Sequence, residues 1–336
     1  MCGIAGILKA GLLSPADTQR DLPRMARALQ HRGPDDEGLW HDAEAGVALC
    51  HRRLSIIDLS PLGHQPMSSA SQGFVVVYNG EIYNYLEMRR ELVARGCAFR
   101  GTSDTEVLLA AIEAWGIASA IERSHGMFAL AVWDRQERVL HLARDRFGEK
   151  PLYFGVLGNT LLFGSELKAL REHATWSDEI DRDALALLMQ HDFVPAPYSI
   201  FKNIRKVMPG SIVTVRASGG RFQMQEQRYW RPEELFDRAA DAAVLRPEEY
   251  IERVDAALTH AVERQMLADV PLGAFLSGGT DSSLVVAYMQ KASTQRVKTF
   301  SIGFEEREYD ESPFAREVAS RLGTEHTELI VSGRDC

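Results

Sequence analysis

The chain opens with MCGIAGILK (residues 1–9), a short apolar run that has a cysteine at its second position. Alternating or wholly apolar runs that close at Gly, Asn or Asp are typical of β-strands. Similar runs recur through the first half of the chain, so the opening segment predicts the first strand of a β-rich domain. The expected strands cover residues 2–8, 46–57, 73–85, 127–134, 138–145, 151–157 and 160–166.

Helical spacing interrupts these strands twice. Apolar residues recur at helical intervals from Leu22 to Leu29, and residues 106–115 form a second apolar-faced segment. Ser103, three residues before Glu106, is typical of a capping box at the start of this second helix. The first half of the chain therefore mixes strands with a few helices.

The pattern changes in the second half of the chain. We expect a helix at 184–191 and a strand at 211–217, and the charged, Ala-rich stretch from about 231 to 247 is typical of a surface linker. Strands then alternate with helices, which predicts a parallel α/β sheet. The expected strands there are 271–276, 298–304 and the start of a third at 326–331, and the expected helices are 250–267, 283–292 and 312–323. We assign the domains to 1–215 and 248–336, with a connecting segment at 216–247.

Length and charge narrow the class of protein. The 336 residues suffice for about two domains, and the net charge of -9 provides no electrostatic footprint for nucleic acid or an anionic membrane. No segment is apolar for long enough to span a bilayer, so we expect a cytoplasmic protein that acts on small molecules. The four cysteines lack metal-type spacing and are interpreted as free thiols.

The position of Cys2 allows a chemistry that is not open to the other three cysteines. Initiator methionine is normally removed before a small residue, and its loss would leave Cys2 with a free α-amine beside its thiol. The reference pKa of an α-amine, about 7.7 to 8.0, suits proton transfer from a thiol of pKa about 8.5 near neutral pH. The residue can therefore supply both nucleophile and base. Position alone, however, favours the interpretation of Cys2 as a small buried residue of a terminal strand.

Five segments of the first half share an order and spacing with a known family. They are MCGIAGI at 1–7, HRGPD at 31–35, RLSIID at 53–58, YNGEIYN at 78–84 and GTSDTE at 101–106. Together they resemble the glutaminase domain of class II glutamine amidotransferases. The resemblance implies an α+β amino-terminal-nucleophile (Ntn) hydrolase sandwich with αββα layers, in which Cys2 attacks the side-chain amide of glutamine.

Asn79 and Gly80 are the candidate oxyanion donors. Amide hydrolysis passes through a tetrahedral oxyanion, which needs hydrogen-bond donors fixed where the charge develops. The side-chain amide of Asn79 and the backbone N–H of Gly80 follow an apolar strand, and glycine permits close approach of the backbone. In isolation, Asn-Gly is also typical of a hairpin turn. The resemblance places both residues in the catalytic set with Cys2.

Glutamine must also be held by its α-carboxylate and α-ammonium groups. A guanidinium is the natural carboxylate clamp, and Arg53 matches that of the family, while Asp104 and Glu81 match its acidic partners for the ammonium. Asp104 alone can equally be an acid favoured at a helix start. Arg32 and Asp35 are interpreted as a local ion pair at a Gly-Pro turn. The expected glutamine-binding residues are Arg53, Leu54, Ser55, Ile56, Ile57, Asn79, Gly80, Glu81 and Asp104.

The segment SGGTDSS at 277–283 carries the second candidate site. It lies between an expected strand and an expected helix, where backbone N–H groups and a helix N-terminus can hold phosphates, although a capped turn would have the same composition. It resembles the pyrophosphate loop of enzymes that activate a carboxylate with ATP and Mg²⁺. The expected ATP-binding residues are Leu276, Ser277, Gly278, Gly279, Asp281, Ser282 and Ile302, with Asp281 as a candidate Mg²⁺ ligand.

A glutaminase followed by a pyrophosphate-loop domain resembles glutamine-dependent asparagine synthetases. The resemblance implies glutamine, aspartate and ATP as substrates, and a homodimer is a further expectation. Because the second domain shows few strand-helix units and no SGEGxDE-like segment, we expect a fragment or truncated form that cannot make asparagine by itself.

Three alternatives remain open at the level of sequence. A related amidotransferase could act on another carboxylate, such as a sugar acid of a polysaccharide. β-Lactam-forming relatives share the layout but typically lack the cysteine nucleophile. A truncated, non-catalytic product is the alternative of a different class.

Overall fold

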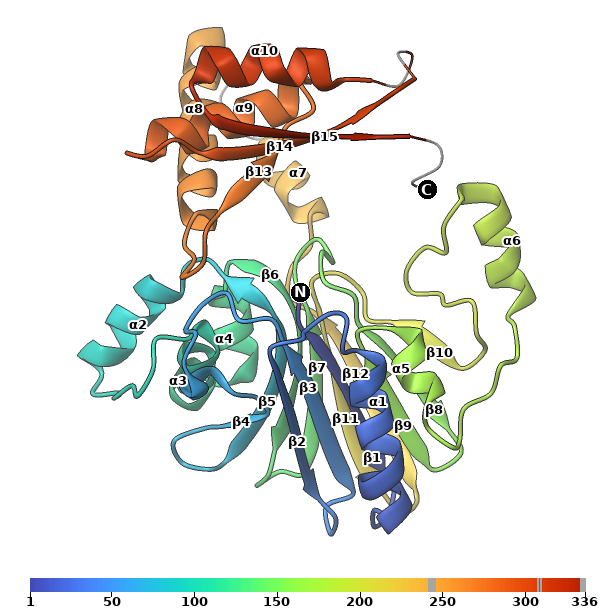
Figure 1. Ribbon diagram of the computed structural model, residues 1–336. Helices are drawn as coiled ribbons and strands as arrows, with labels where there is room; N and C mark the ends of the chain where they lie inside the picture. The colour runs from blue at the N-terminus through green and yellow to red at the C-terminus, as the bar shows by residue number, and fades with distance from the viewer. Residues whose placement is uncertain (241–245, 307, 309, 333–336) are drawn as a thin grey trace. The chain divides into compact units, whose positions relative to one another are not determined.

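The computed structural model describes residues 1–240, 246–306, 308 and 310–332, with the side chains of 237–240 also left undescribed (Figure 1). The chain divides into two compact units, Met1–Ala239 and Ala240–Cys336. Each unit has its own hydrophobic core. The two are therefore considered separately.

The first sheet of the first unit is built around its opening strand. β1 (Gly3–Lys9) pairs antiparallel with β3 (Val47–Arg53) on one side and with β9 (Thr160–Gly164) on the other. Six of the seven β1 residues are buried because both faces of the sheet are covered. The sheet has the order β10-β8-β9-β1-β3-β2, completed by β2 (Asp36–Asp42), β8 (Tyr153–Leu157) and β10 (Ile204–Lys206).

The second sheet carries the Asn-Gly segment. β5 (Phe74–Ile82) pairs antiparallel with β6 (Gly126–Asp134), and Asn79 and Gly80 lie within this pairing opposite Ala129 and Phe128. The two residues are therefore part of a strand and do not form a hairpin turn. The sheet has the order β12-β11-β7-β6-β5-β4, completed by β4 (Met67–Ser68), β7 (Val139–Arg144), β11 (Ser211–Ser218) and β12 (Arg221–Arg228).

The two sheets enclose the main core, and helices cover their outer faces. Side chains from both sheets, such as Ile4, Leu49, Val77 and Trp133, pack into one buried cluster. Outside the first sheet lie α1 (Leu22–Ala28) and α5 (Leu167–Arg171). Outside the second sheet lie α2 (Tyr85–Ala94), α3 (Asp104–Trp115) and α4 (Ile117–Arg123). The expected αββα sandwich is confirmed.

Several boundaries differ from the sequence expectations. The strand expected at 46–57 ends at Arg53, and residues 54–57 form a loop. Residues 221–228, assigned to the connecting segment, form the edge strand β12. Its side chains are almost all exposed, so the apolar alternation that reveals an inner strand is missing. Residues 241–245 of the segment lie outside the described residues.

The remaining elements of the first unit are short or peripheral. They are the π-helix η1 (Asp17–Asp21), the 3-10 helix η2 (Pro61–Gly63), α6 (Arg182–His191) and α7 (Glu233–Ala240).

The second unit contains a three-stranded parallel sheet, as its sequence pattern predicts. β14 (Lys298–Phe304) lies between β13 (Gly273–Phe275) and β15 (Glu325–Val331). Leu276 and Val286 pack with Ala315 and Ala319 in its core. Its helices are α8 (Pro247–Gln265), α9 (Thr280–Ala292) and α10 (Ser312–Leu322).

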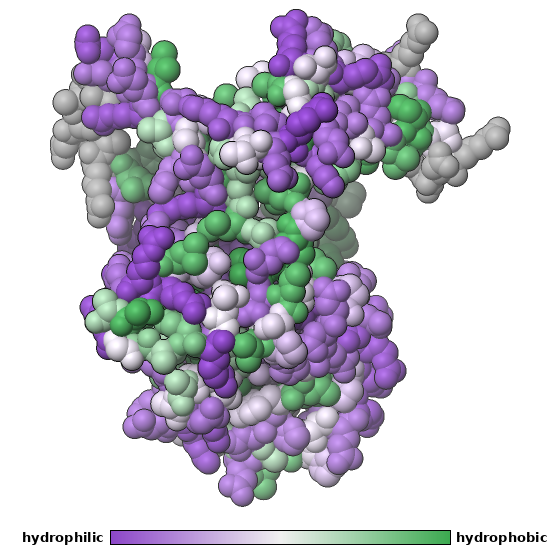
Figure 2. Space-filling model, turned by 60° about the vertical axis from the view of Figure 1, so that its left-hand side comes forward, coloured by the Kyte–Doolittle hydropathy of each residue, from purple (hydrophilic) through white to green (hydrophobic). Residues whose placement is uncertain are grey.

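The face of the molecule in Figure 2 is largely hydrophilic, with apolar residues in scattered patches. Among the described residues, no helix combines the length and the apolar character that crossing a membrane requires.

Leu49 tests the core between the sheets. Its side chain is 0% exposed, so Leu49→Ala should lower the free energy of unfolding by about 2–5 kcal/mol through lost burial and a residual cavity. All five tryptophans (Trp40, Trp115, Trp133, Trp176 and Trp230) lie in the first unit, so tryptophan fluorescence during urea unfolding reports on this unit. The matched control is Leu12→Ala, at a position that is 70% exposed, with an expected change within about 0.5 kcal/mol. Equal effects of the two variants would contradict the assigned core.

Candidate functional site

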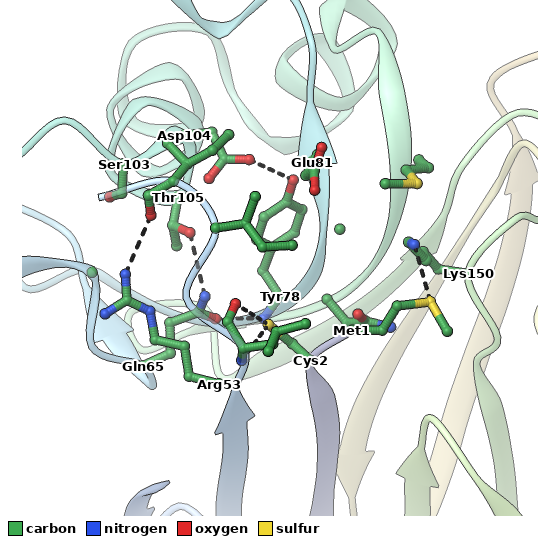
Figure 3. A pocket seen from close by; sticks show the side chains of 17 residues that line it. Met1, Cys2, Arg53, Gln65, Tyr78, Glu81, Ser103, Asp104, Thr105 and Lys150 are labelled. Carbon is green, nitrogen blue, oxygen red and sulfur yellow. Dashed lines mark hydrogen bonds between the residues drawn. The ribbon is translucent and has the colours of Figure 1, made fainter. Parts of the chain in front are cut away.

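A cavity of about 210 Å³ opens beside Cys2 in the first unit (Figure 3). Most residues expected to form the glutamine site line it, and Ser55 is the exception because its backbone N–H is directed to Asp35 Oδ2 at 2.8 Å. The expected residues at the cavity are Cys2, Arg53, Leu54, Ile56, Ile57, Asn79, Gly80, Glu81 and Asp104. The sequence reasoning missed Met1, Gly63, Gln65, Tyr78, Ser103, Thr105, Met127 and Lys150.

The Cys2 thiol is held against the loop that follows β3. Its Sγ lies 3.4 Å from the backbone N of Leu54, which donates to it, and 3.6 Å from the carbonyl oxygen of Leu54. Burial raises the pKa of this thiol. The thiol is therefore protonated at neutral pH and needs a base if it is to act as a nucleophile.

Arg32 fixes the backbone of Cys2. Its Nε donates to the Cys2 carbonyl oxygen at 2.8 Å, and its Nη1 donates to Glu166 Oε1 at 2.8 Å. Although burial raises it, hydrogen bonds from Arg32, Lys168 and His31 lower the pKa of Glu166 to about 2. Arg32 therefore supports Cys2 from outside the cavity lining, a contact that its Gly-Pro context did not reveal.

Asn79 presents an unused donor to the cavity. Its side chain is 1% exposed, and its Nδ2 has no hydrogen-bond partner among the described residues. A buried unpaired amide is costly, which makes it typical of a site where a ligand supplies the missing acceptor. At Gly80 a Cβ atom would lie 2.2 Å from the Met127 carbonyl oxygen, so only glycine fits. The two residues bring an amide donor and a close backbone to the side of Cys2.

Arg53 shapes the loop above the cavity. Its Nη1 donates to the Ser60 carbonyl oxygen at 3.0 Å, and its Nη2 donates to the carbonyl oxygens of Ile57 and Asp58. A side chain at Gly63 would collide with this guanidinium. Arg53 thus holds the loop of residues 57–60 against its guanidinium, and it also lines the cavity.

Two carboxylates face the same cavity. Asp104, at the start of α3, accepts from Tyr78 Oη at 2.8 Å and from the backbone N of Ile82 at 3.0 Å. Burial raises the pKa of Asp104, and burial followed by the charge of Asp104 raises that of Glu81. Neither carboxylate has an ion-pair partner within 4.0 Å among the described residues, so a bound cationic group would stabilise both.

The capping box expected at α3 is only half formed. Ser103 Oγ accepts from the backbone N of Glu106 at 3.3 Å, as a capping residue does. The Glu106 carboxylate accepts instead from the backbone N atoms of Arg100 and Gly101. This arrangement orders the turn that delivers Asp104 to the cavity.

The expected nucleotide loop joins β13 to α9 in the second unit. Ser277 Oγ lies 2.9 Å from Ser282 Oγ, so the start of α9 is tied back to the strand end. Gly278 has a φ of 83°, and a Cβ there would meet Phe314 Cβ at 2.6 Å. Leu276, Ser277 and Ile302 line a cavity of about 170 Å³ beside the loop. Of the other expected residues, Gly278 and Gly279 form the turn, and Asp281 and Ser282 lie in the first turn of α9.

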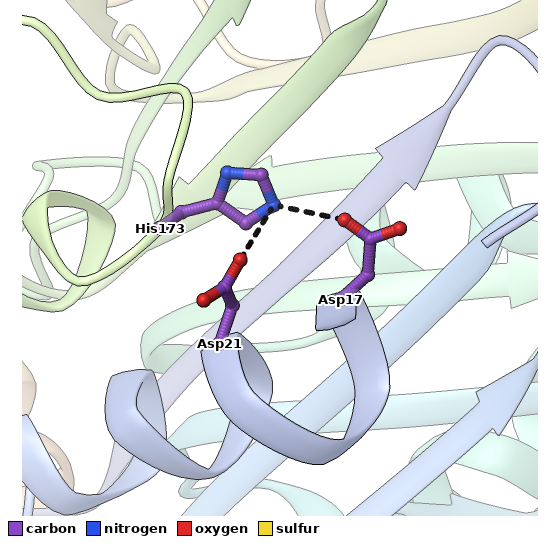
Figure 4. A group of neighbouring side chains, drawn as sticks. All are labelled: Asp17, Asp21 and His173. Carbon is purple, nitrogen blue, oxygen red and sulfur yellow. Dashed lines mark ion pairs between the residues drawn. The ribbon is translucent and has the colours of Figure 1, made fainter. Parts of the chain in front are cut away.

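A buried cluster outside the cavity combines Asp17, Asp21 and His173 (Figure 4). The two carboxylates lie four residues apart on η1, and His173 Nε2 faces both, at 3.4 Å from Asp17 Oδ1 and 3.8 Å from Asp21 Oδ2. His173 Nδ1 accepts from the backbone N of Thr175 at 3.2 Å, which assigns the ring proton to Nε2. Nε2 therefore carries the ring proton and faces the carboxylates without forming a hydrogen bond to either of them, and it has no free lone pair for a metal ion.

The αββα sandwich of the first unit is the fold of the amino-terminal-nucleophile (Ntn) hydrolase class. A solved structure of glutamine phosphoribosylpyrophosphate amidotransferase from Bacillus subtilis, complexed with ADP and GMP, superposes with a TM-score of 0.52 at 17% identity. The superposition covers 99% of this chain and 91% of that one. At this identity the similarity establishes the fold alone.

Sequence comparison identifies the family within this class. A glutamine amidotransferase domain model matches residues 1–230, and an asparagine synthase model matches residues 253–336. The chain belongs to the glutamine amidotransferase domain family. It is 38% identical to glutamine-hydrolyzing asparagine synthetase 1 of B. subtilis strain 168, covering 99% of this chain and 50% of the relative. It is 34% identical to glutamine-hydrolyzing asparagine synthetase 3 of that strain, covering 100% and 55%. The chain thus spans about half the length of these curated relatives.

The ionisation of Glu166 makes the free energy of unfolding depend on pH. Its folded pKa of about 2 lies below its ordinary value of 4.5, so its ionised form stabilises the fold above pH 4.5. That contribution is lost progressively as the pH falls from 4.5 toward 2. Glu166→Gln should lower the free energy of unfolding at pH 7 by about 1 kcal/mol, given partial solvent screening.

The measurement is urea unfolding followed by tryptophan fluorescence at several pH values. The difference between wild type and Glu166→Gln should shrink on acidification below pH 4.5. Glu172→Gln is the matched control, because Glu172 pairs with Arg24 at the surface. A difference for Glu166→Gln that stays constant down to pH 3 would contradict the assigned ionisation.

Proposed function

We propose that the first unit hydrolyses glutamine to glutamate and ammonia with Cys2 as the nucleophile. The unpaired, buried Nδ2 of Asn79 beside Cys2 is the observation that carries this proposal, because it is the donor that an oxyanion requires. Cys2, Asn79 and Gly80 form the proposed catalytic set. The family assignment supports the same chemistry.

The proposed reaction begins once Met1 has been removed. The α-amine of Cys2 takes the thiol proton, and Sγ attacks the side-chain carbonyl carbon of glutamine. Asn79 Nδ2 and the Gly80 backbone N–H donate to the oxyanion. The amine then returns the proton to the leaving nitrogen, which departs as ammonia and leaves a glutamyl thioester. Water hydrolyses the thioester to glutamate and restores the thiol.

Charged side chains of the cavity would bind the two charged groups of glutamine, its α-carboxylate and its α-ammonium. The Arg53 guanidinium donates to three loop carbonyl oxygens. It has five N–H donors in all, so the remaining ones can bind the α-carboxylate. Glu81 and Asp104 suit the α-ammonium. Leu54, Ile56 and Ile57 supply apolar contacts, and Ser55, which does not line the cavity, would only order the loop through its hydrogen bond to Asp35.

For the second domain, assigned to 248–336, we propose the ATP-dependent half of an asparagine synthase. The loop fits a nucleotide: Gly278 packs its backbone against Phe314, the N-terminus of α9 is suited to phosphate, and an apolar cavity with Leu276 and Ile302 is suited to adenine. Asp281 is exposed at the start of α9, where it could ligate Mg²⁺. ATP would activate the aspartate side chain, which ammonia converts to asparagine with release of AMP and pyrophosphate. A cytoplasmic location and a homodimer belong to the same proposal.

Cys2→Ala tests the glutaminase proposal directly. Glutamate release from glutamine by purified chain should fall to background, because the variant keeps the α-amine but has no nucleophile. Cys97→Ala is the control and should keep wild-type activity, because Cys97 does not line the cavity. Intact mass should show in both variants that Met1 has been removed. Undiminished hydrolysis by Cys2→Ala would reject Cys2 as the nucleophile.

Asn79→Ala separates transition-state stabilisation from substrate binding. Loss of one oxyanion donor should lower kcat about 100- to 1000-fold, with a much smaller change in KM. Steady-state glutamate release at saturating glutamine provides the measurement. Asn84→Ala is a control at a buried asparagine of the same segment that does not line the cavity. A fall in kcat/KM carried by KM alone would assign Asn79 to binding.

A further inference from the structure

Lys150 is a buried cation at the cavity with no function in the proposed reaction. It is 6% exposed, it lines the cavity, and it follows β7 in a tight turn. Its backbone is fixed on both sides, since its N–H donates to Asp145 Oδ2 at 3.0 Å and its carbonyl oxygen accepts from Arg144 Nε at 2.7 Å. The side chain therefore starts from a rigid position.

The ammonium of Lys150 points to the amino terminus (Figure 3). Its Nζ lies 3.3 Å from Met1 Sδ, and none of the ion pairs formed by the described residues includes it. Burial lowers the pKa of Lys150, and its charged neighbours partly offset one another: Glu81, Glu149 and Asp145 raise it, and Arg32 lowers it. A buried ammonium without a close carboxylate is unfavourable, so a structural role alone does not account for it.

Different charged groups shift the pKa of the terminal amine and the pKa of the Cys2 thiol. Burial lowers the pKa of the Met1 α-amine, Arg32 and Lys150 lower it further, and Cys2 and Glu81 raise it. At the Cys2 thiol the neighbouring charges are instead the terminal amine, Asp104 and Arg53. Lys150 thus acts on the amine that Met1 carries in the unprocessed chain, whereas Arg53 is the cationic side chain that acts on the thiol. Removal of Met1 would move the amine to the nitrogen of Cys2, which is bonded to the residue that Lys150 contacts, and Cys2 lines the same cavity as Lys150.

We propose that Lys150 is a positioning residue for the glutaminase reaction: its ammonium, held at the terminal end of the cavity, keeps the α-amine of Cys2 free of its proton. This inference rests on the proposed function, in which that amine is the base. A base must be unprotonated before it can accept the thiol proton. A fixed positive charge nearby disfavours a second positive charge on the amine, and burial of both strengthens the effect.

The test is the pH profile of kcat/KM for glutamine in the processed chain. Lys150→Met should shift the acidic limb upward by about one pH unit, which lowers kcat/KM about tenfold on that limb while leaving the KM at high pH unchanged. Lys150→Arg keeps the charge and should restore the wild-type limb. Lys206→Met is the matched control, because Lys206 is another lysine whose pKa burial lowers, and it does not line the cavity. An unshifted limb in Lys150→Met would overturn the proposal.

A second measurement does not depend on catalysis. Competitive acetylation by trace acetic anhydride, read by mass spectrometry of the amino-terminal peptide, titrates the α-amine of Cys2. In wild type the midpoint should lie below the reference of about 7.7, and in Lys150→Met it should rise. A wild-type midpoint at or above that reference would overturn the proposal even if Lys150→Met fails to fold. A low midpoint without glutamine hydrolysis would instead reject the proposed function and leave the electrostatic assignment standing.

Discussion

The pairing of β1 with β3 and β9 is the constraint on which the site depends. β1 runs through the middle of a six-stranded sheet, and its burial leaves no freedom in register, because a shift of one residue would exchange its two buried faces. Cys2 immediately precedes this strand, so its position follows from that register. The partner strand β3 ends at Arg53, and the Leu54 backbone that meets Cys2 Sγ comes directly after it. One ladder thus places Cys2 and the wall of the cavity beside it together.

The buried groups inside the cavity lack the ionic partners that buried charged groups outside it have. Outside it, buried charges are paired: Asp17 accepts from Lys9 and Ser14, and Asp21 accepts from Arg20. Inside it, the thiol of Cys2, the carboxylates of Asp104 and Glu81 and the ammonium of Lys150 are desolvated without close ionic partners. Unpaired polar groups gathered in one cavity are typical of functional sites, since ligands supply the missing partners.

Much of the fold was predictable where apolar alternation is strong. The inner strands of both sheets follow the expected pattern because both of their faces meet packed layers, and the helices α1 and α3 follow it because one face of each packs on a sheet. The edge strands β2 and β12 were missed, since polar side chains at an edge carry little periodicity. Three of the residues named from the motifs, Cys2, Asn79 and Asp104, line one cavity. Arg32 and Lys150 were not assigned to the site, because only tertiary folding brings residues from such distant segments to the amino terminus.

The contact that Arg32 makes with Cys2 has a consequence for maturation. Arg32 binds the carbonyl oxygen of Cys2, and the strand that follows is anchored from Gly3 onward, so neither support involves Met1. In the proposed reaction, cleavage of the first peptide bond would therefore convert an amide nitrogen into a basic amine while both supports of Cys2 stay in place. Activation would then be a purely chemical event, which requires no refolding of the surrounding chain.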